Sequence, residues 1–505
     1  MADGQTSAQA APYKGTNKLL LGIVLGVLTF WLFAQTTLNI NSVMSAELGI
    51  DASTMNIAVS ITSLFSGIFI VVMGGLADRV GRMKVVTSGF FLSIIGSALV
   101  AFAPAGAVAY PMLLVGRALQ GLSAACIMPA SLALVKTYWQ GKDRQRAVSM
   151  WSIGSWGGSG FCSLFGGFMT GALGWRSIFL ISIVVAVIGL LLMRGAPEYK
   201  VKSSGDYKFD LPGVIVFMIA MVSIQVFVTQ GNKIGWTSPI CVALLVSSFV
   251  FTALFIRLES NNAHAFFNFK LFQNKTYAGA TLSNFLLNGV AGTLMVSLNL
   301  MQLGGGMSAS EAGMLTLGYA ITIIAFIRVG EKLLQRFGAR KPMIWGCMIT
   351  GAAILFLSPA NLLLSQYKVS AIIGYALFGL GLAFYATPST DAALSSLPEE
   401  QAGSGAGIYK MASSLGSAFG VAISAAIFTA LSGDASAVSW LQGIFEFAGR
   451  TSNIAVREAG MIALYFNFAM AMIAIIAIML TVPKAEREER SGKAAKKGAS
   501  EAQAD

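Results

Sequence analysis

Charge is scarce in this sequence of 505 residues. Asp, Glu, Lys and Arg together make up 11% of it, whereas a soluble domain carries about 25%. Hydrophobic residues make up 55%. A chain of this composition cannot cover itself with polar side chains, so most of it must face lipid or other apolar helices. A soluble globular protein is therefore excluded.

Cysteine and histidine are also rare in the sequence. The four cysteines, Cys126, Cys162, Cys241 and Cys347, lie in separate apolar segments, and the one histidine, His264, lies in a polar connection. This spacing excludes a disulfide framework and a clustered metal site. The sequence also lacks a Gly-x-x-x-x-Gly-Lys-Ser/Thr segment that would bind phosphates. We therefore expect no metal, no cofactor, no use of ATP and no enzymatic activity.

Long apolar stretches take up most of the sequence. Fourteen of them are about 20 residues long, which is the length that a helix needs to cross a bilayer. They lie near 18–44, 54–77, 83–105, 109–136, 145–172, 174–196, 209–230, 236–258, 277–302, 310–333, 339–360, 367–395, 402–431 and 457–483. None shows the alternation of a barrel strand, and lipid satisfies no backbone polar group, so we predict fourteen transmembrane helices.

The net charge of +12 is concentrated in the connections that follow even-numbered stretches. Basic residues there are Arg79, Arg82, Lys84, Lys136, Lys142, Arg144, Arg146, Lys200, Lys202, Lys208, Lys332, Arg336, Arg340 and Lys341. The opposite connections hold Arg176, Lys233, Lys368, Arg450 and Arg457. Lys and Arg accumulate in cytoplasmic connections. We therefore predict a multi-pass protein of the bacterial cytoplasmic membrane, in contact with lipid, with both termini in the cytoplasm and no nucleic-acid partner.

The first and last parts of the chain resemble each other. Three pairs of matching positions are separated by 257, 259 and 258 residues, namely Gly81 and Gly338, Pro129 and Pro388, and Gly158 and Gly416. This repeat predicts an all-α membrane protein of two six-helix bundles plus two inserted helices. In transporters built from such repeats, the substrate site lies between the bundles near the middle of the membrane.

The repeat also divides the chain into parts. We predict a cytoplasmic N-terminal segment (1–17), an N-terminal six-helix bundle (18–196), a linker with the two inserted spans (197–276), a C-terminal six-helix bundle (277–483) and a disordered cytoplasmic tail (484–505).

The connection between the second and third spans contains a candidate gate made of Gly74, Asp78, Arg79, Gly81 and Arg82. The glycines allow a tight turn and a close approach of helices. The acid and the arginines can form a charge network at the cytoplasmic mouth that is made in one conformation and broken in another. The alternative is an ordinary basic connection with an incidental acid.

Candidate proton-coupling groups are few, because we expect nearly all acids to lie in connections or tails. Asp391 in the twelfth span is the exception, and Lys410 early in the thirteenth span could pair with it. We hypothesise that this pair opens and closes with protonation; the alternatives are a static ion pair or an Asp wetted by the cytoplasm. Glu331, near Arg328, is a second candidate, with a structural role at the gate as its alternative.

Polar residues within the spans are the candidates for substrate binding. They are Gln35, Asn39, Gln120, Asn284, Asn288 and Asn467. Arg117, buried in the fourth span, must face a polar interior and have partners, because an intramembrane Arg costs about 2.5–3.5 kcal/mol on insertion scales. One role for Arg117 is to pin helices by hydrogen bonds.

These motifs together resemble the fourteen-span drug:proton antiporters of the major facilitator superfamily over residues 18–483. The gate residues Gly74–Lys84 and Gly403-x-Gly405-x-Gly407 fit the family, and Ser123–Pro129 and Tyr385–Asp391 resemble its staphylococcal quinolone-resistance branch. The resemblance implies that Arg117 takes part in proton transfer. The chain departs from the family at Gln35, where an acid is common, and at Cys162-Ser163, where a Gly-Pro pair is usual.

The resemblance implies proton-coupled export of amphipathic drugs, such as quinolones, quaternary ammonium compounds and dyes, by a monomer that works by alternating access. The alternative is an exporter of one endogenous metabolite, such as an amino acid, a peptide or a lipid precursor, on the same fold. A third reading is a receptor or scaffold with a degenerate transporter fold, and the complete gate motif argues against it.

Overall fold

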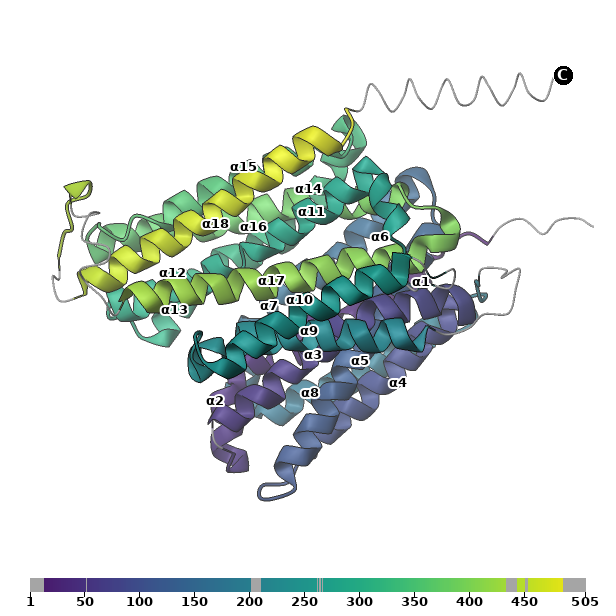
Figure 1. Cartoon of the computed structure of the whole chain (residues 1–505), viewed down its shortest axis with the longest axis horizontal. Coiled ribbons are helices and arrows are strands. Elements are labelled where there is room, and N and C mark those ends of the chain that lie inside the picture. The colour runs from purple at the N-terminus through teal and green to yellow at the C-terminus, as the bar shows by residue number, and fades with distance from the viewer. Residues whose placement is uncertain are drawn as a thin grey trace, which may run out of the picture.

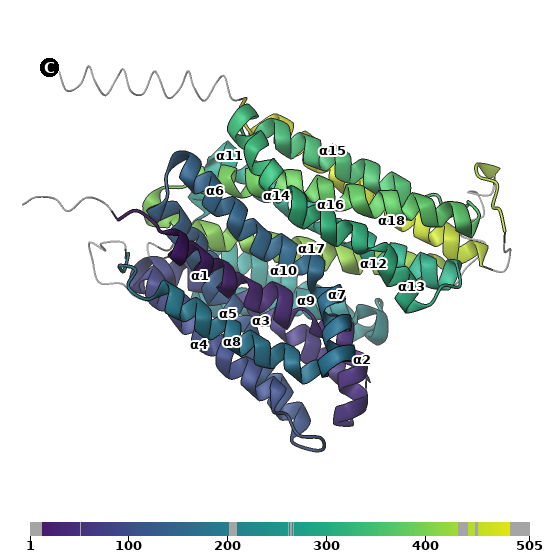
Figure 2. The same cartoon turned by 180° about the vertical axis from the view of Figure 1, so that it is seen from behind.

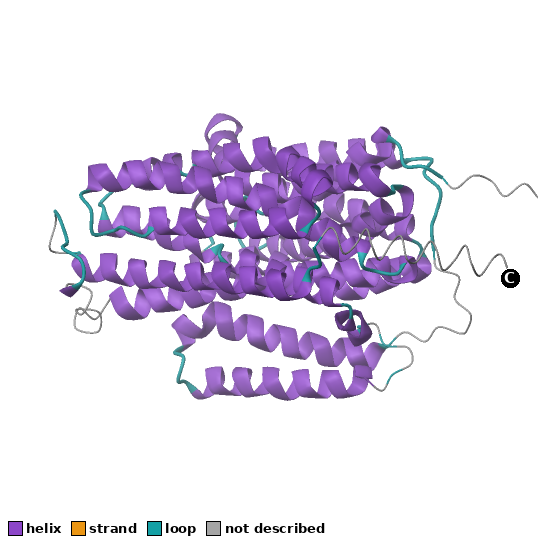
Figure 3. Cartoon of the chain, turned by 90° about the horizontal axis from the view of Figure 1, so that it is seen from above, coloured by secondary structure: helices purple, strands orange, loops and turns teal. Residues whose placement is uncertain are grey.

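The computed structural model of the chain describes residues 13–50, 52–200, 210–260, 262, 265, 267–432, 443–449 and 453–484. These residues form helices joined by short connections, with no strand among them (Figure 3). The predicted all-α membrane architecture is therefore confirmed. His264 and all of the predicted tail except Lys484 lie outside the described residues.

A first helix group runs from α1 to α8. Its elements are α1 (Asn17–Leu28), the π-helix η1 (Thr29–Ala34), α2 (Thr37–Leu48), α3 (Ala52–Val80), α4 (Arg82–Ala101), α5 (Ala109–Tyr138), α6 (Gly141–Ser152), the π-helix η2 (Ile153–Gly157), α7 (Gly158–Leu173) and α8 (Trp175–Met193). Here α3, α4 and α5 pack against one another, and α8 packs on α4 and α1.

A second helix group runs from α11 to α18. Its elements are the 3₁₀ helix η3 (Phe269–Gln273), α11 (Lys275–Gly289), α12 (Gly292–Asn299), the π-helix η4 (Leu300–Gly304), α13 (Ala309–Leu315), α14 (Leu317–Phe337), α15 (Arg340–Leu357), α16 (Leu364–Ser395), η5 (Glu399–Gln401), α17 (Ala402–Ser432) and α18 (Ile454–Thr481). Between the two groups in sequence stands a helical hairpin of α9 (Leu211–Ile234) and α10 (Pro239–Ser260).

Eleven helices in the described part of the chain are long and apolar enough to cross a membrane. The stretches predicted near 145–172, 209–230 and 339–360 are also helical, as α6 to α7, α9 and α15, and they are not among these eleven. For α6 and α15 one physical reason is the charged residues at their start, such as Arg144 and Arg340. The count of fourteen spans therefore stays a prediction.

Several spans expected to be continuous are broken. The first is α1, η1 and α2, with the break at Gln35 and Thr36, and the ninth is interrupted between α11 and α12. Such breaks leave backbone carbonyls without helical partners, which in a membrane must bond to neighbouring side chains.

The expectation that Asp391 is the exception among acids confined to connections and tails is wrong. Asp78, Glu259, Glu331 and Glu458 also lie within helices and are buried. Arg457, expected in a connection, is likewise buried in the first turn of α18.

The two helix groups meet at one end and diverge toward the other (Figure 1; seen from behind in Figure 2). We call the end where they meet the basic end, since the last turns of α3 and α5 contain Arg79 and Lys136 there. The longest contact between the groups runs along α17, which packs on α3 and α5. The α9–α10 hairpin lies at the front in Figure 1, where α9 contacts both α3 and α17.

Candidate functional site

Asp78 joins the two helix groups at the basic end. Its Oδ1 accepts a hydrogen bond from the backbone N–H of Gly403 and its Oδ2 one from Ser404, both at 3.0 Å. These amides belong to the first turn of α17, where N–H groups lack helical partners and the helix dipole favours a negative charge. Asp78 at the end of α3 therefore caps a helix of the other group.

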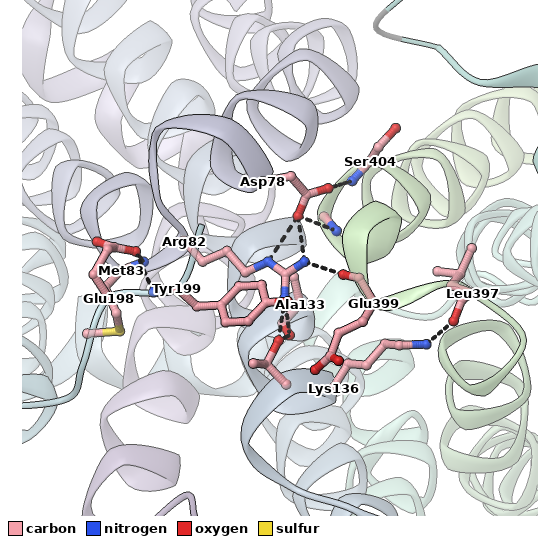
Figure 4. A network of polar contacts seen from close by, with 12 residues as sticks. Asp78, Arg82, Met83, Ala133, Lys136, Glu198, Tyr199, Leu397, Glu399 and Ser404 are labelled. Atoms are coloured by element: carbon pink, nitrogen blue, oxygen red, sulfur yellow. Dashed lines mark hydrogen bonds and ion pairs between the residues drawn. The ribbon is translucent and has the colours of Figure 1, made fainter. Parts of the chain in front are cut away.

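Arg82 completes this junction (Figure 4). Its Nε and Nη2 donate to Asp78 Oδ1 at 2.9 and 2.8 Å, and Nη2 also donates to the backbone oxygen of Glu399 at 2.7 Å. The side chain is fully buried, and it also bonds to Ala133 and Thr137 at the end of α5. One guanidinium thus links α3, α5 and the connection before α17.

The turn that brings Arg82 to Asp78 depends on Gly81. This residue has φ +130°, and a Cβ there would lie 2.5 Å from the carboxyl carbon of Glu198. That carboxylate caps the start of α4 by accepting from the N–H groups of Met83 and Lys84, each at 2.9 Å. The Tyr199 ring lies 4.6 Å from the Arg82 guanidinium carbon, and burial, followed by the charge of Glu399, raises the pKa of its phenol.

Glycines bring α3 and α17 into backbone contact just inside this junction. A Cβ at Gly74 would lie 2.4 Å from the carbonyl oxygen of Gly403, and one at Gly403 would lie 2.5 Å from that of Gly74. A Cβ at Gly407 would lie 2.9 Å from the oxygen of Ile70. Small residues at such positions allow helices to pack at this distance.

Two basic residues of the first group also reach the second. Lys136 Nζ donates to the backbone oxygens of Leu394, at 2.5 Å, and of Leu397, at the C-terminal end of α16. Arg144 Nε on α6 forms an ion pair of 3.0 Å with Asp391 Oδ1 on α16. We call the contacts of Asp78, Arg82, Lys136 and Arg144 with the second group the basic-end gate.

Farther from the gate, two cavities lie between the groups. The larger, of about 480 Å³, is lined by η1, α3, α17 and the α9–α10 hairpin, with Trp31, Gln35 and Gln225 among its residues. The smaller, of about 100 Å³, is lined by Trp31, Asn288, Lys410 and others from both groups. Trp31 borders both, so the two cavities are neighbours.

The predicted substrate-binding residues divide into two classes. Gln35 and Asn288 line the cavities. Asn284 and Asn467 are fully buried and bond to Ser413 and Ser424 of α17, and neither lines a cavity. The side chain of Asn39 lies outside the described residues.

Gln120 belongs to the surroundings of Arg117. Its Oε1 accepts from Arg117 Nη1 at 2.7 Å and its Nε2 donates to Ser97 at 3.1 Å, so it orients the arginine. Arg117 Nη1 also donates to the carbonyl oxygen of Ala34 at 2.8 Å, at the break in the first span. The arginine thus has the polar partners expected of it, and it satisfies a carbonyl next to the helix break.

The hypothesised pair of Asp391 and Lys410 is not among the ion pairs between described residues. Asp391 pairs with Arg144 instead, while Lys410 Nζ lies 4.3 Å from the centre of the Trp151 ring. Arg144 and Trp151 are seven residues apart on α6, which places them on one face of the helix. Both partners come from α6 in the first group, which spacing within the second group does not reveal.

Glu331 is buried on α14 and bonds to Arg328 and to Gln335, three and four residues away on the same helix. At the repeat offset of 257, Gln335 is the counterpart of Asp78. A neutral amide therefore stands in the second group where the first group has its capping acid. Arg79 lies half-buried on the last turn of α3.

Sequence reasoning missed the role of Lys136, Arg144 and Glu198 at the basic end, and it missed Glu458. Basic residues near helix ends were used only to predict the orientation of the chain in the membrane. The C-terminal end of a helix also attracts a positive charge, as the end of α16 does with Lys136. Glu458 is 0% exposed, and neither carboxyl oxygen has a hydrogen-bond partner among the described residues. Its place inside the apolar stretch 457–483 was the signal available for it.

The family model for the Major Facilitator Superfamily matches residues 19–298 and 276–503. Two proteins of Staphylococcus aureus, from strains MRSA252 and bovine RF122 / ET3-1, are both described as quinolone resistance protein NorB. Each is 48% identical to this chain, over 476 and 475 residues, covering 94% of this chain and 97% of the relative.

Solved structures share the fold at low sequence identity. The proton:xylose symporter XylE bound to 6-bromo-6-deoxy-D-glucose aligns with a TM-score of 0.60 and 16% identity, over 92% of this chain and 96% of that one. The human organic anion transporter MFSD10 aligns with a TM-score of 0.57 and 14% identity, over 91% and 98%.

Proposed function

The chain belongs to the Major Facilitator Superfamily, and we propose that it is a proton-coupled multidrug efflux antiporter that exports amphipathic drugs by alternating access. The identity of 48% to quinolone resistance proteins over nearly the whole chain supports drug export. Candidate substrates are quinolones, quaternary ammonium compounds and dyes, and the working unit is a monomer in lipid.

The proposed orientation places the basic end in the cytoplasm, as the distribution of Lys and Arg favours. The helix groups are then closed toward the cytoplasm and diverge toward the outside (Figure 1). This is the arrangement of an outward-facing state, from which a substrate leaves and into which an external proton enters.

The observation that carries the proposal is the capping of α17 by Asp78 across the two groups. The gate joins side chains of one group to helix ends and backbone oxygens of the other, as Lys136 also does. Such contacts can be released together when the groups rock apart, without unfolding a helix. At the centre of the junction, Asp78 and Arg82 are both buried and form an ion pair of 2.8 Å.

Proton coupling is proposed to act through Asp391. A proton that neutralises this carboxylate removes the charge that Arg144 faces at 3.0 Å, which weakens the gate and favours opening to the cytoplasm. Release of the proton inside restores the ion pair. Arg117 is proposed to assist by holding the break in the first span. Glu331 is proposed to stabilise the second group at the gate. Lys410 is proposed to contribute from the lining of the smaller cavity.

Ethidium efflux from proteoliposomes, with and without an imposed pH gradient, tests this function. Wild-type protein is expected to show gradient-driven efflux, and Asp391→Asn is expected to lose the response to the gradient. Asp143→Asn is the matched control, because Asp143 is an exposed acid near the basic end that pairs with Lys14, whose side chain is also exposed.

Equal gradient-driven efflux by wild type and Asp391→Asn would move proton coupling to another group, with Glu331 the next to test. Absence of any dye or quinolone movement in the wild type would contradict multidrug export and favour the exporter of a single endogenous metabolite.

A further inference from the structure

We propose that Lys410 binds the carboxylate of aromatic substrates, so that the smaller cavity, which it lines, selects for compounds carrying a negative group. This inference rests on the proposed export function and names the chemistry that the cavity recognises. It assigns Lys410 a direct contact with the substrate rather than a contact with Asp391.

Lys410 is a buried cation that pairs with no carboxylate in the part of the chain that the structure describes. It is 3% exposed, yet no carboxylate of the described residues lies within ion-pair distance of its Nζ, and no hydrogen bond joins the ammonium to them. An ammonium has three donors to satisfy, and burying a charge without a partner is costly. A ligand with an anionic group supplies the missing partner.

The surroundings keep the ammonium at the cavity. Its Nζ lies over the ring of Trp151 at 4.3 Å, and Trp151 is fully buried and held by a hydrogen bond from Nε1 to Ser131 at 2.9 Å. The electron-rich face of an indole attracts a cation but neutralises none of its charge. Trp151 therefore positions Lys410 beside the smaller cavity and leaves its charge available.

Neither cavity offers a negative charge. Among the described residues that line the two cavities, none is Asp or Glu, and Lys410 is the one with a charge. Cations bound in such a space meet repulsion from Lys410 and no attraction from an acid. Aromatic side chains, including Trp31, Trp156 and Tyr319, provide flat surfaces for the body of a planar ligand.

Asn288 adds a second point of recognition. Its Nδ2 donates to the backbone oxygen and to Oδ1 of Asn284, at 2.8 and 2.9 Å, so its donors are used. Its own Oδ1 remains to accept a hydrogen bond at the cavity that Lys410 also lines. The site thus suits an aromatic carboxylate that also carries an N–H donor.

Binding to the purified full-length protein tests the inference by quenching of tryptophan fluorescence, with three probes: norfloxacin, its decarboxylated analogue and ethidium. Lys410→Met is expected to weaken norfloxacin binding by about tenfold or more, because a buried charge contact is lost. Ethidium, a permanent cation, is expected to bind this variant more tightly than the wild type. Lys410→Arg should restore norfloxacin binding in part. Lys275→Met, which removes an exposed lysine at the start of α11, is the control.

Equal weakening of norfloxacin and ethidium by Lys410→Met, or unchanged norfloxacin binding, would overturn the inference. So would equal affinity of the wild type for norfloxacin and its decarboxylated analogue. The proposed function is tested separately, since norfloxacin binding that depends on Lys410 without gradient-driven transport would contradict export and leave the binding site standing.

Discussion

Lys136 and Leu394 are separated by 258 residues and touch each other, because Lys136 Nζ donates to the backbone oxygen of Leu394 at 2.5 Å. Lys136 lies on α5 and Leu394 on α16, the two helices that carry the matching Pro129 and Pro388 of the sequence repeat. At their offset of 259 the counterpart of Lys136 is Ser395, so Lys136 meets the residue next to its own counterpart where the two helix groups join. The side chain of Leu394 has no donor, so it makes no matching hydrogen bond to the first helix group. The capping of α17 by Asp78 is one-sided in the same way.

Removal of this contact is predicted to open the basic end. A hydrogen bond to a charged group contributes about 1.5–3 kcal/mol, so Lys136→Met should shift the equilibrium away from the closed gate by about tenfold or more. Distances between spin labels at Lys142 on α6 and Ser395 on α16, both exposed positions, measure the change. An unaltered distance distribution would show that Lys136 does not hold the gate.

Gly74→Ala is predicted to prevent full closure. Its Cβ would lie 2.4 Å from the carbonyl oxygen of Gly403, which is backbone and cannot turn aside. We expect gradient-driven efflux to fall by about tenfold or more, since the closed state becomes a minor population. Gly171→Ala on α7 is the control, because nothing lies within 4 Å of a Cβ there. Wild-type efflux by Gly74→Ala would contradict close packing of α3 and α17 during transport.

Arg144 and Asp391 are predicted to act as a unit. We expect Arg144→Gln and Asp391→Asn each to reduce gradient-driven efflux, and the double variant to be no worse than the more impaired single one. The reason is that each substitution alone removes the same ion pair of 3.0 Å. Efflux rates of the four proteins form a double-mutant cycle, and additive losses would show that the residues act independently.

Arg117→Met is predicted to destabilise the protein. The variant leaves the amide oxygen of Gln120 without the donor it now has, whereas the carbonyl oxygen of Ala34 keeps the Thr37 hydroxyl at 3.0 Å. A buried group left without a partner costs about 1–3 kcal/mol, so thermal unfolding in detergent should begin at a lower temperature. Loss of transport at an unchanged unfolding temperature would instead assign Arg117 to proton transfer.

Glu458→Met is predicted to raise the unfolding temperature. Both carboxyl oxygens of this fully buried residue lack partners among the described residues, and replacing an unsatisfied polar group with an apolar one of similar length relieves about 1–3 kcal/mol. A drop in efflux in the same variant would give Glu458 a role in transport. A lower unfolding temperature would show that the carboxyl group has a partner in the folded protein.

Local pattern predicted the helices and the gate motif, but not the contacts between groups. The apolar stretches and the residues Asp78, Gly81 and Arg82 stand close together in sequence, so spacing alone pointed to their joint role. The partner of Asp391 was predicted wrongly because Arg144 is 247 residues away. The polarity of Asn284 and Asn467 within a span predicted contact with substrate. Polarity alone does not show whether a neighbouring helix already supplies the hydrogen-bond partner of the side chain.

The sequence by itself determined that the chain is a bundle of membrane-spanning helices, because lipid leaves a long apolar segment no other way to satisfy its backbone. It also indicated the tight turn after α3, because Gly81 stands there, and the turn has a positive φ that favours glycine. The tertiary structure alone decided that Asp78 caps α17, that Arg144 pairs with Asp391 and that Lys410 lines the smaller cavity with no carboxylate of the described residues at ion-pair distance. These are contacts between helices distant in sequence, and each depends on which faces the packing of the two groups brings together.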